Sequence, residues 1–232
     1  FKEQNGAHQP LVYSSVDIRD SGQKLAPVDT NVFPAGFNNL TKSFYEDTAG
    51  KFNSYFNRYK KSDKVLIIPE NHTRNKPYLK NVDVLKLLIE KTGRRVDVRK
   101  LGELSGDIDV DIILLNNDLT LGVPEALQNC AQVIIPDLKL GWYSRTKSSH
   151  FNSYEKVVNE FGHKFGIDPF FISTLFHGCG EASFINSQGL EGIAESVDKM
   201  ISVLRLKYKE HDITDEPYVF IKAEQGTYGM GI

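Results

Sequence analysis

The stretch KVLIIPENHTRN, at residues 64–75, decides the fold of this chain. Its first six residues form an apolar run of the length and kind that parallel sheets bury on both faces, and its last six are polar. Two later segments repeat this order, with DIILL at 111–115 followed by NND and QVII at 132–135 followed by PDLK. Helical patterns separate the runs. The sequence therefore predicts an α/β fold with a doubly wound, Rossmann-like parallel sheet over roughly residues 60–140.

Polar side chains follow three of the expected strands. Sheets of this kind bind ligands beyond the carboxyl ends of their strands, so these exits are candidate binding positions. They carry His72, Thr73, Arg74, Asn75, Asn116, Asn117, Asp137 and Lys139. A polar loop after a strand is also ordinary surface structure, and for any single cluster we prefer that interpretation. Arg74 is the strongest candidate, because a guanidinium can grip a carboxylate with two hydrogen bonds and fix its orientation.

The segments before the sheet have simpler interpretations. Residues 11–33 hold two β-rich runs on either side of Asp20, Ser21 and Gly22, which predicts a hairpin. Residues 39–59 carry aromatic residues at helical spacing, which predicts a long amphipathic helix. We expect its aromatic side chains to belong to the core.

The character of the chain changes after Trp142. The polar segment SRTKSSH at 144–150 is typical of a linker, and amphipathic helices are expected at 151–165 and 190–208. We therefore predict a domain boundary near residues 141–147, which divides the chain into domains at 1–141 and 142–232.

The last fifteen residues, YVFIKAEQGTYGMGI at 218–232, carry the clearest functional signal. An alternating run predicts a strand that leads into Lys222, and three glycines follow within nine residues. Backbone N–H groups of such glycines approach an anion closely, while the ammonium group neutralises phosphate charge. The competing interpretation is a glycine-rich turn beside a solvated lysine, because short glycine motifs match many unrelated proteins. No GKS or GKT follows, so this is not a P-loop.

Composition excludes several classes of function. The chain of 232 residues has a formal net charge of -2, which gives no support for binding nucleic acid. No apolar run approaches the roughly 18 residues of a membrane span, and no amino-terminal signal is present. With two cysteines, a reducing cytoplasm is the expected location. Because the chain stops in or just after the glycine loop, we expect it to be a fragment of a longer protein.

Three blocks of sequence together resemble the proteobacterial glutamate–cysteine ligases of ATP-grasp type: VDTNVFPAGFNNL at 28–40, NHTRN at 71–75 and KAEQGTYGMGI at 222–232. The resemblance implies a Rossmann-like substrate domain followed by the first part of an ATP-grasp α+β domain. It further implies an enzyme that uses ATP and Mg²⁺ to join the γ-carboxylate of glutamate to the amine of cysteine through an acyl phosphate. This reaction is the first step of glutathione biosynthesis.

The resemblance also assigns residues to roles. In ATP-grasp enzymes a lysine from each of two segments lies on the phosphates and a glycine loop covers them. The implied nucleotide-binding residues are Lys147, Lys222, Glu224, Gly226, Thr227, Tyr228 and Gly229. The implied amino-acid site is Arg74, in a catalytic role, with Arg19, Asn31, Asn39, His72 and Asn75. The family's magnesium carboxylates follow the glycine loop, so the metal ligands stay unassigned, as does a homo-oligomeric state.

Three other functions are compatible with the sequence. The chain could be another amide-forming ligase of ATP-grasp type, similar to glutathione synthetase, which would use the same lysines and loop. A regulatory module would bind nucleotide without turnover. A sheet domain with no nucleotide partner would show no thermal shift with ATP and magnesium, because only a ligand that binds the native state stabilises it.

Overall fold

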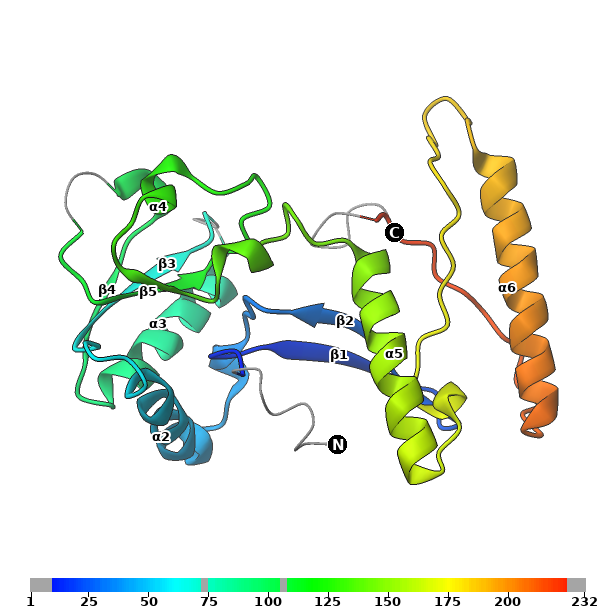
Figure 1. Cartoon of the computed structure of the whole chain (residues 1–232), viewed down its shortest axis with the longest axis horizontal. Coiled ribbons are helices and arrows are strands. Elements are labelled where there is room, and N and C mark those ends of the chain that lie inside the picture. The colour runs from blue at the N-terminus through cyan, green and yellow to red at the C-terminus, as the bar shows by residue number, and fades with distance from the viewer. Residues whose placement is uncertain (1–9, 72–74, 105–107, 225–232) are drawn as a thin grey trace. The chain divides into compact units, whose positions relative to one another are not determined.

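The computed structural model describes residues 10–71, 75–104 and 108–224 (Figure 1). The chain divides into two compact units. The first, which we call the sheet unit, comprises Thr30–Ser144 with the segment before Val16. The second, the helical unit, comprises Val16–Asp29 and the segment from Arg145 onward. The domain division at 141/142 stays a prediction.

A parallel four-stranded sheet forms the centre of the sheet unit. Its strands are β3 (Lys64–Pro69), β4 (Arg95–Val98), β5 (Ile112–Asn116) and β6 (Val133–Ile135), in the order β4-β3-β5-β6. All three pairings are parallel, and the register places Val65 opposite Ile112. The predicted α/β class and parallel sheet are confirmed.

Helices cover both faces of this sheet because its central strands are apolar over Val65–Pro69 and Ile112–Leu115 and need burial on both sides. Figure 1 shows α2 (Tyr45–Phe56) and α3 (Lys76–Glu90) on one side and the short α4 (Glu125–Gln128) on the other. Alternation along β3 sends Ile67 into the cluster with α2 and α3, and Leu66 into the cluster with α4. Both side chains are fully buried.

The helix expected over residues 39–59 begins later than predicted. Two short 3₁₀ turns, η1 (Phe37–Asn39) and η2 (Lys42–Phe44), precede α2. Thr41 between them has an extended backbone, with ψ at 146°. That conformation ends the first turn, so the α-helical hydrogen bonds start only at Tyr45.

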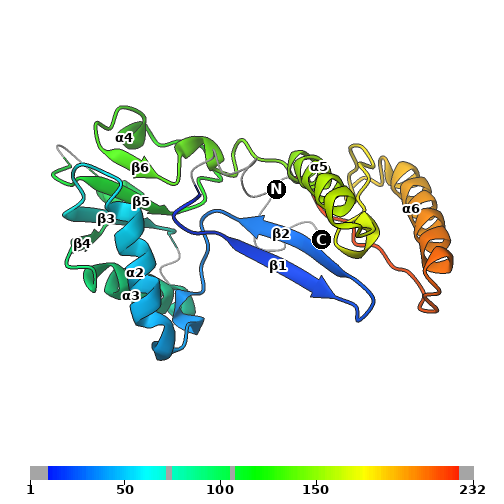
Figure 2. The ribbon, with the colours of Figure 1, turned by 60° about the horizontal axis from the view of Figure 1, so that its bottom comes forward.

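The helical unit contains a two-stranded hairpin and two long helices. The hairpin is formed by β1 (Ser15–Asp20) and β2 (Leu25–Asn31), as predicted. Its turn is closed by Asp20 Oδ1, which accepts from the Gly22 N–H at 2.8 Å. Figure 2 shows the two strands side by side, with α5 (Lys147–Phe165) beside them. The short η5 (Pro169–Phe171) follows, and then α6 (Leu190–Glu210).

The strand expected at 218–221 is absent. The segment has no strand conformation, and none of the strands in the described ranges pairs with it. Tyr218 and Phe220 are largely exposed. An alternating pattern becomes a strand only when a neighbour supplies hydrogen bonds, and here the described chain supplies none. Across the same described ranges, no helix is both long enough and apolar enough to cross a membrane.

Candidate nucleotide-phosphate site

The amino terminus of α5 organises the candidate site. Thr146 precedes the helix in an extended conformation, and its Oγ1 accepts from the Ser149 N–H at 3.3 Å. Two further first-turn N–H groups bind Glu224, which lies far along the sequence. Lys147 N–H donates to the Glu224 carbonyl oxygen at 3.2 Å, and Ser148 N–H donates to its Oε1 at 3.2 Å. The Ser148 hydroxyl donates to the same carboxylate oxygen.

These contacts bring the two predicted lysines together. Lys222 is two residues from Glu224, and its Nζ donates to the Val28 carbonyl oxygen at 3.3 Å. Lys147 lies close enough to Lys222 for their charges to interact. Burial lowers the pKa of Lys147, and the positive charge of Lys222 lowers it further. Asp29 and Glu224 act in the opposite direction. The lysine of α5 and the lysine of the later segment therefore lie near each other in this unit. Their contact with a nucleotide stays a prediction.

Three further ionisable side chains, Arg145, Asp29 and His150, belong to the same network of interactions as Lys147. Burial lowers the pKa of Arg145, and the Asp29 carboxylate opposes that change. Burial also lowers the pKa of His150, with Arg145 acting in the same direction and Asp29 against it. We call the group formed by Lys147, Lys222, Arg145, Asp29 and Glu224 the lysine site. It gathers three cationic side chains and two carboxylates in one place. Such a concentration of partly buried cations suits a ligand with several negative charges.

Asp29, Arg145 and His150 were not predicted from the sequence. Asp29 lies at the end of a hairpin strand, where a solvated carboxylate is the ordinary expectation. Its importance depends on groups more than a hundred positions away, and no local pattern encodes that proximity. Arg145 stands in the polar segment before α5, two residues ahead of the predicted Lys147. Its position beside a predicted lysine is the signal that could have identified it.

The remaining predicted positions have varied surroundings. Gly226, Thr227, Tyr228, Gly229, His72 and Arg74 lie outside the described residues. Arg19 and Asn39 are exposed. Asn31 Oδ1 accepts from the Phe33 N–H at 2.8 Å, and Asn75 caps α3 by accepting from the Tyr78 N–H at 3.2 Å. Their proposed contacts with substrate stay predictions.

The strand exits of the sheet unit hold a network of buried polar side chains. Asn116 Nδ2 donates to the Pro34 carbonyl oxygen at 2.8 Å, and Asn117 Nδ2 donates to that of Pro69 at 3.1 Å. Both amides therefore satisfy loop backbone. Beside them, Glu70 accepts a hydrogen bond from the Asp118 N–H. Burial raises the pKa of Glu70 to about 7, and the nearby Asp118 carboxylate raises it too. Glu70 directly follows β3 but was not among the residues predicted for a site.

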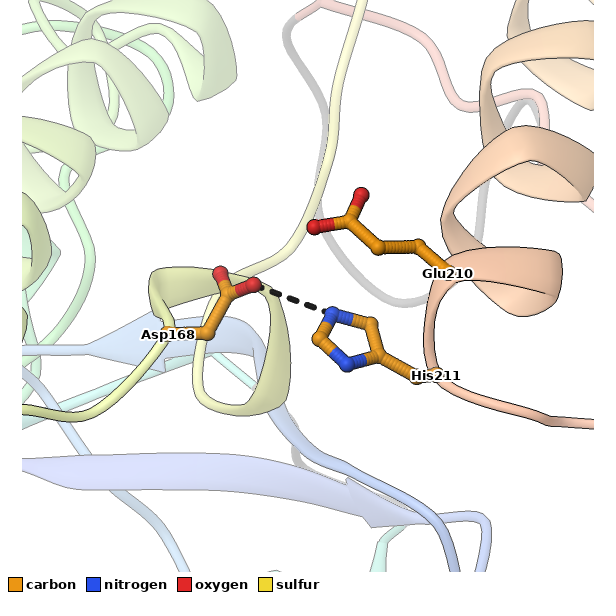
Figure 3. A group of neighbouring side chains, drawn as sticks. All are labelled: Asp168, Glu210 and His211. Carbon is orange, nitrogen blue, oxygen red and sulfur yellow. Dashed lines mark hydrogen bonds and ion pairs between the residues drawn. The ribbon is translucent and has the colours of Figure 1, made fainter.

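A second cluster of ionisable groups lies at the end of α6 (Figure 3). Ligand atoms of Asp168, Glu210 and His211 lie within 4.8 Å of one another. His211 Nε2 is 3.0 Å from Asp168 Oδ2. However, the Lys207 ammonium lies 2.9 Å from Glu210 Oε2 and 3.7 Å from Asp168 Oδ2, so it already neutralises both carboxylates. Asp168 also caps η5 by accepting from the Phe170 N–H. The cluster connects α6 to η5.

Comparisons with known proteins agree with the resemblance noted from the sequence. The chain matches the model of the glutamate–cysteine ligase family over residues 1–108 and 99–232. A crystal structure described as that of a gamma-glutamylcysteine synthetase from Methylobacillus flagellatus KT matches with a TM-score of 0.84 and 35% sequence identity. The match covers 93% of this chain and 57% of that one, so the chain spans little more than half of its relative. No curated protein matches. The chain belongs to the glutamate–cysteine ligase family.

Proposed function

We propose that this chain is part of an ATP-dependent, ADP-forming ligase that joins the γ-carboxylate of L-glutamate to the amine of L-cysteine. Family membership supports the general reaction, and the structural relative is described as a synthetase of that product. The observation that carries the proposal is the convergence of Lys147 and Lys222, from segments 75 residues apart, within one unit. We place the enzyme in the cytoplasm and the helical unit in an ATP-grasp domain.

The reaction demands control of charge. A γ-carboxylate oxygen of glutamate must attack the γ-phosphorus of ATP, although both groups are negative. In our proposal the ammonium groups of Lys147 and Lys222 offset that repulsion and stabilise the charge that develops as ADP leaves. The product of this step is an acyl phosphate. The cysteine amine then attacks the acyl carbon, phosphate departs, and the nitrogen loses a proton to give the amide.

The lysine site has a feature that suits a polyanion. Burial is the main cause of the lowered pKa of Lys147, and repulsion from the Lys222 ammonium group lowers it further. A triphosphate would convert this repulsion into two attractive interactions. We propose that Arg74, with Arg19, Asn31, Asn39, His72 and Asn75, orients the amino-acid substrate. We propose that Gly226, Thr227, Tyr228 and Gly229 cover the phosphates and exclude water.

The oxygen atoms of the lysine site can be compared with those that Mg²⁺ needs. The two carboxylates of the lysine site, Asp29 and Glu224, interact with cationic side chains and with Ser148. Mg²⁺ prefers an octahedral set of oxygen donors, usually with several waters and substrate phosphates. The described residues of the lysine site do not provide such a set. The family's use of ATP with Mg²⁺ remains part of the proposal.

Release of inorganic phosphate by the full-length protein tests this function. We expect ATP-dependent release with glutamate and cysteine, and none with γ-glutamylcysteine and glycine. The reverse pattern would identify a ligase similar to glutathione synthetase. Tight ATP binding without phosphate release from either pair would identify a nucleotide-binding module and refute the proposed reaction.

A further inference from the structure

Every N–H group in the first turn of α5 has a partner. A helix normally leaves its first N–H groups without intrahelical acceptors, so each must be satisfied from elsewhere. Lys147 N–H and Ser148 N–H donate to the backbone and side chain of Glu224, and Ser149 N–H donates to Thr146 Oγ1. His150 N–H donates to the Thr146 carbonyl oxygen, which begins the helical pattern.

This arrangement has a consequence for anion binding. The positive end of a 19-residue helix would otherwise attract a phosphate. In this protein the carboxylate of Glu224 occupies that position. The hydroxyl of Ser148 lowers the pKa of Glu224, with support from the Ser148 N–H, the Thr146 side chain and the charge of Lys147. Glu224 is therefore ionised at neutral pH and bonded to donors that are well placed for a negative charge.

The same contacts act against the repulsion between the lysines. Lys222 is two residues before Glu224 in the chain, so docking the Glu224 backbone and carboxylate on α5 limits where the Lys222 backbone can lie. The Lys222 ammonium is then placed by its hydrogen bond to Val28 O. Two like charges that repel stay together only when other contacts hold their backbones in place. Glu224 supplies such contacts on the Lys147 side of the site.

We propose that Glu224 is a positioning residue: its carboxylate, bound to Ser148 at the amino terminus of α5, holds Lys222 beside Lys147 in the arrangement that binds the phosphates of ATP. This inference rests on the proposed function. It changes the role that the family resemblance suggests for Glu224, from contact with the nucleotide to support of the residues that make contact. In this arrangement the phosphates meet lysine side chains, and Glu224 occupies the helix terminus.

The experiment measures steady-state kinetics and ATP affinity by calorimetry in the full-length protein. Its variants are Glu224→Ala, Glu224→Gln, Ser148→Ala and the double variant Glu224→Ala/Ser148→Ala. We expect Glu224→Ala to weaken ATP binding and raise the KM for ATP about tenfold, with a smaller effect on kcat. Glutamine should restore part of the affinity, because its amide oxygen still accepts from Ser148. The double variant should bind ATP no more weakly than the more severe single variant, since both single substitutions remove the same interaction.

Glu155→Ala is the matched control. It removes an exposed carboxylate further along α5 and should bind ATP as the wild type does.

Each other outcome overturns the inference. Unchanged ATP affinity in Glu224→Ala would show that Glu224 does not position the lysines. Tighter binding would show that its carboxylate is a placeholder that ATP displaces. If the losses of ATP affinity in the two alanine variants add fully in the double variant, Ser148 and Glu224 act separately. If the wild type binds ATP but releases no phosphate with either substrate pair, the proposed reaction is wrong. The ATP affinities of the variants then still test whether Glu224 positions the lysines. If the wild type binds no ATP, both proposals fail.

Discussion

Asn81 shows how one buried side chain can hold a loop of the sheet unit. Its Oδ1 accepts from the N–H groups of Gly36 and Phe37, at 2.7 and 2.9 Å, and its Nδ2 donates to Asn116 Oδ1 at 3.2 Å. The side chain is 1% exposed. A buried N–H without an acceptor costs about 1–3 kcal/mol, which makes Asn81 important for the stability of this unit.

We expect Asn81→Ala to lower the free energy of unfolding by about 2–4 kcal/mol, because it leaves two N–H groups without their acceptor. Urea denaturation measures this change. Asn129→Ala, at an exposed position of the same unit, is the matched control and should change stability by less than about 0.5 kcal/mol. Equal effects of the two substitutions would contradict this account of Asn81.

Glu70 predicts a pH dependence of stability. Its pKa is raised by burial from an ordinary 4.5 to about 7, so the folded state binds a proton that the unfolded state has released. Stability from this group is present below about pH 4.5 and is lost as the pH rises to about 7. After solvent screening, the loss should be on the order of 1–2 kcal/mol. Glu70→Gln should make the free energy of unfolding nearly independent of pH in this window. At pH 8 the variant should have a higher free energy of unfolding than the wild type. Parallel profiles for the two proteins would rule out the raised pKa.

The sequence predicted single residues unevenly. Lys222 could be selected because three glycines follow it, and Lys147 could be selected from the family resemblance. The two side chains lie near each other in the helical unit. Asp29 and Glu70 could not be selected from the sequence. Asp29 interacts with Arg145 in a distant segment, and the raised pKa of Glu70 comes from burial and from Asp118. Asn116 was selected as a strand-exit residue, but its amide group holds the Pro34 carbonyl oxygen. A polar residue at such an exit serves a loop as readily as a ligand.

At the scale of elements, two helical glycines should respond oppositely to alanine. Gly50 in α2 is exposed, and a Cβ there would meet no atom within 4 Å. Gly162 in α5 is buried, and its Cβ would lie 2.5 Å from the Ile167 carbonyl oxygen. We expect Gly50→Ala to stabilise the protein by about 0.5–1 kcal/mol and Gly162→Ala to destabilise it by about 1–3 kcal/mol. Thermal unfolding measures both, and a stabilising Gly162→Ala would contradict the close approach of the Ile167 backbone to α5.

The elements that the sequence predicted well are those that depend on burial alone. Apolar runs at 64–69 and 111–115 gave β3 and β5, because a parallel sheet covered on both faces requires such runs. The segment at 218–221 has an alternating pattern but no strand, because that depends on a pairing partner. The start of α2 depended on the extended backbone at Thr41, which composition does not reveal.

At the scale of the whole molecule, the family match and the structural relative extend over both units. The lysine site, however, is contained in the helical unit, where the hairpin supplies Asp29 and Val28, and α5 and the later segment supply the lysines. Sequence separation within this site therefore exceeds a hundred residues. The three sequence blocks indicated the family and included Glu224, whereas the hydrogen bonds that join Glu224 to α5 could be seen only in the fold.

The most direct test of the account is the affinity of the full-length protein for ATP with magnesium, measured by calorimetry in the wild type, Lys147→Met, Lys222→Met and the control Lys156→Met. Lys156 is an exposed residue of α5 outside the lysine site. We predict that each of the first two substitutions weakens binding by about 10–100-fold, while the control leaves it unchanged. Wild-type affinity in either Lys147→Met or Lys222→Met would contradict the claim that both ammonium groups bind one polyphosphate.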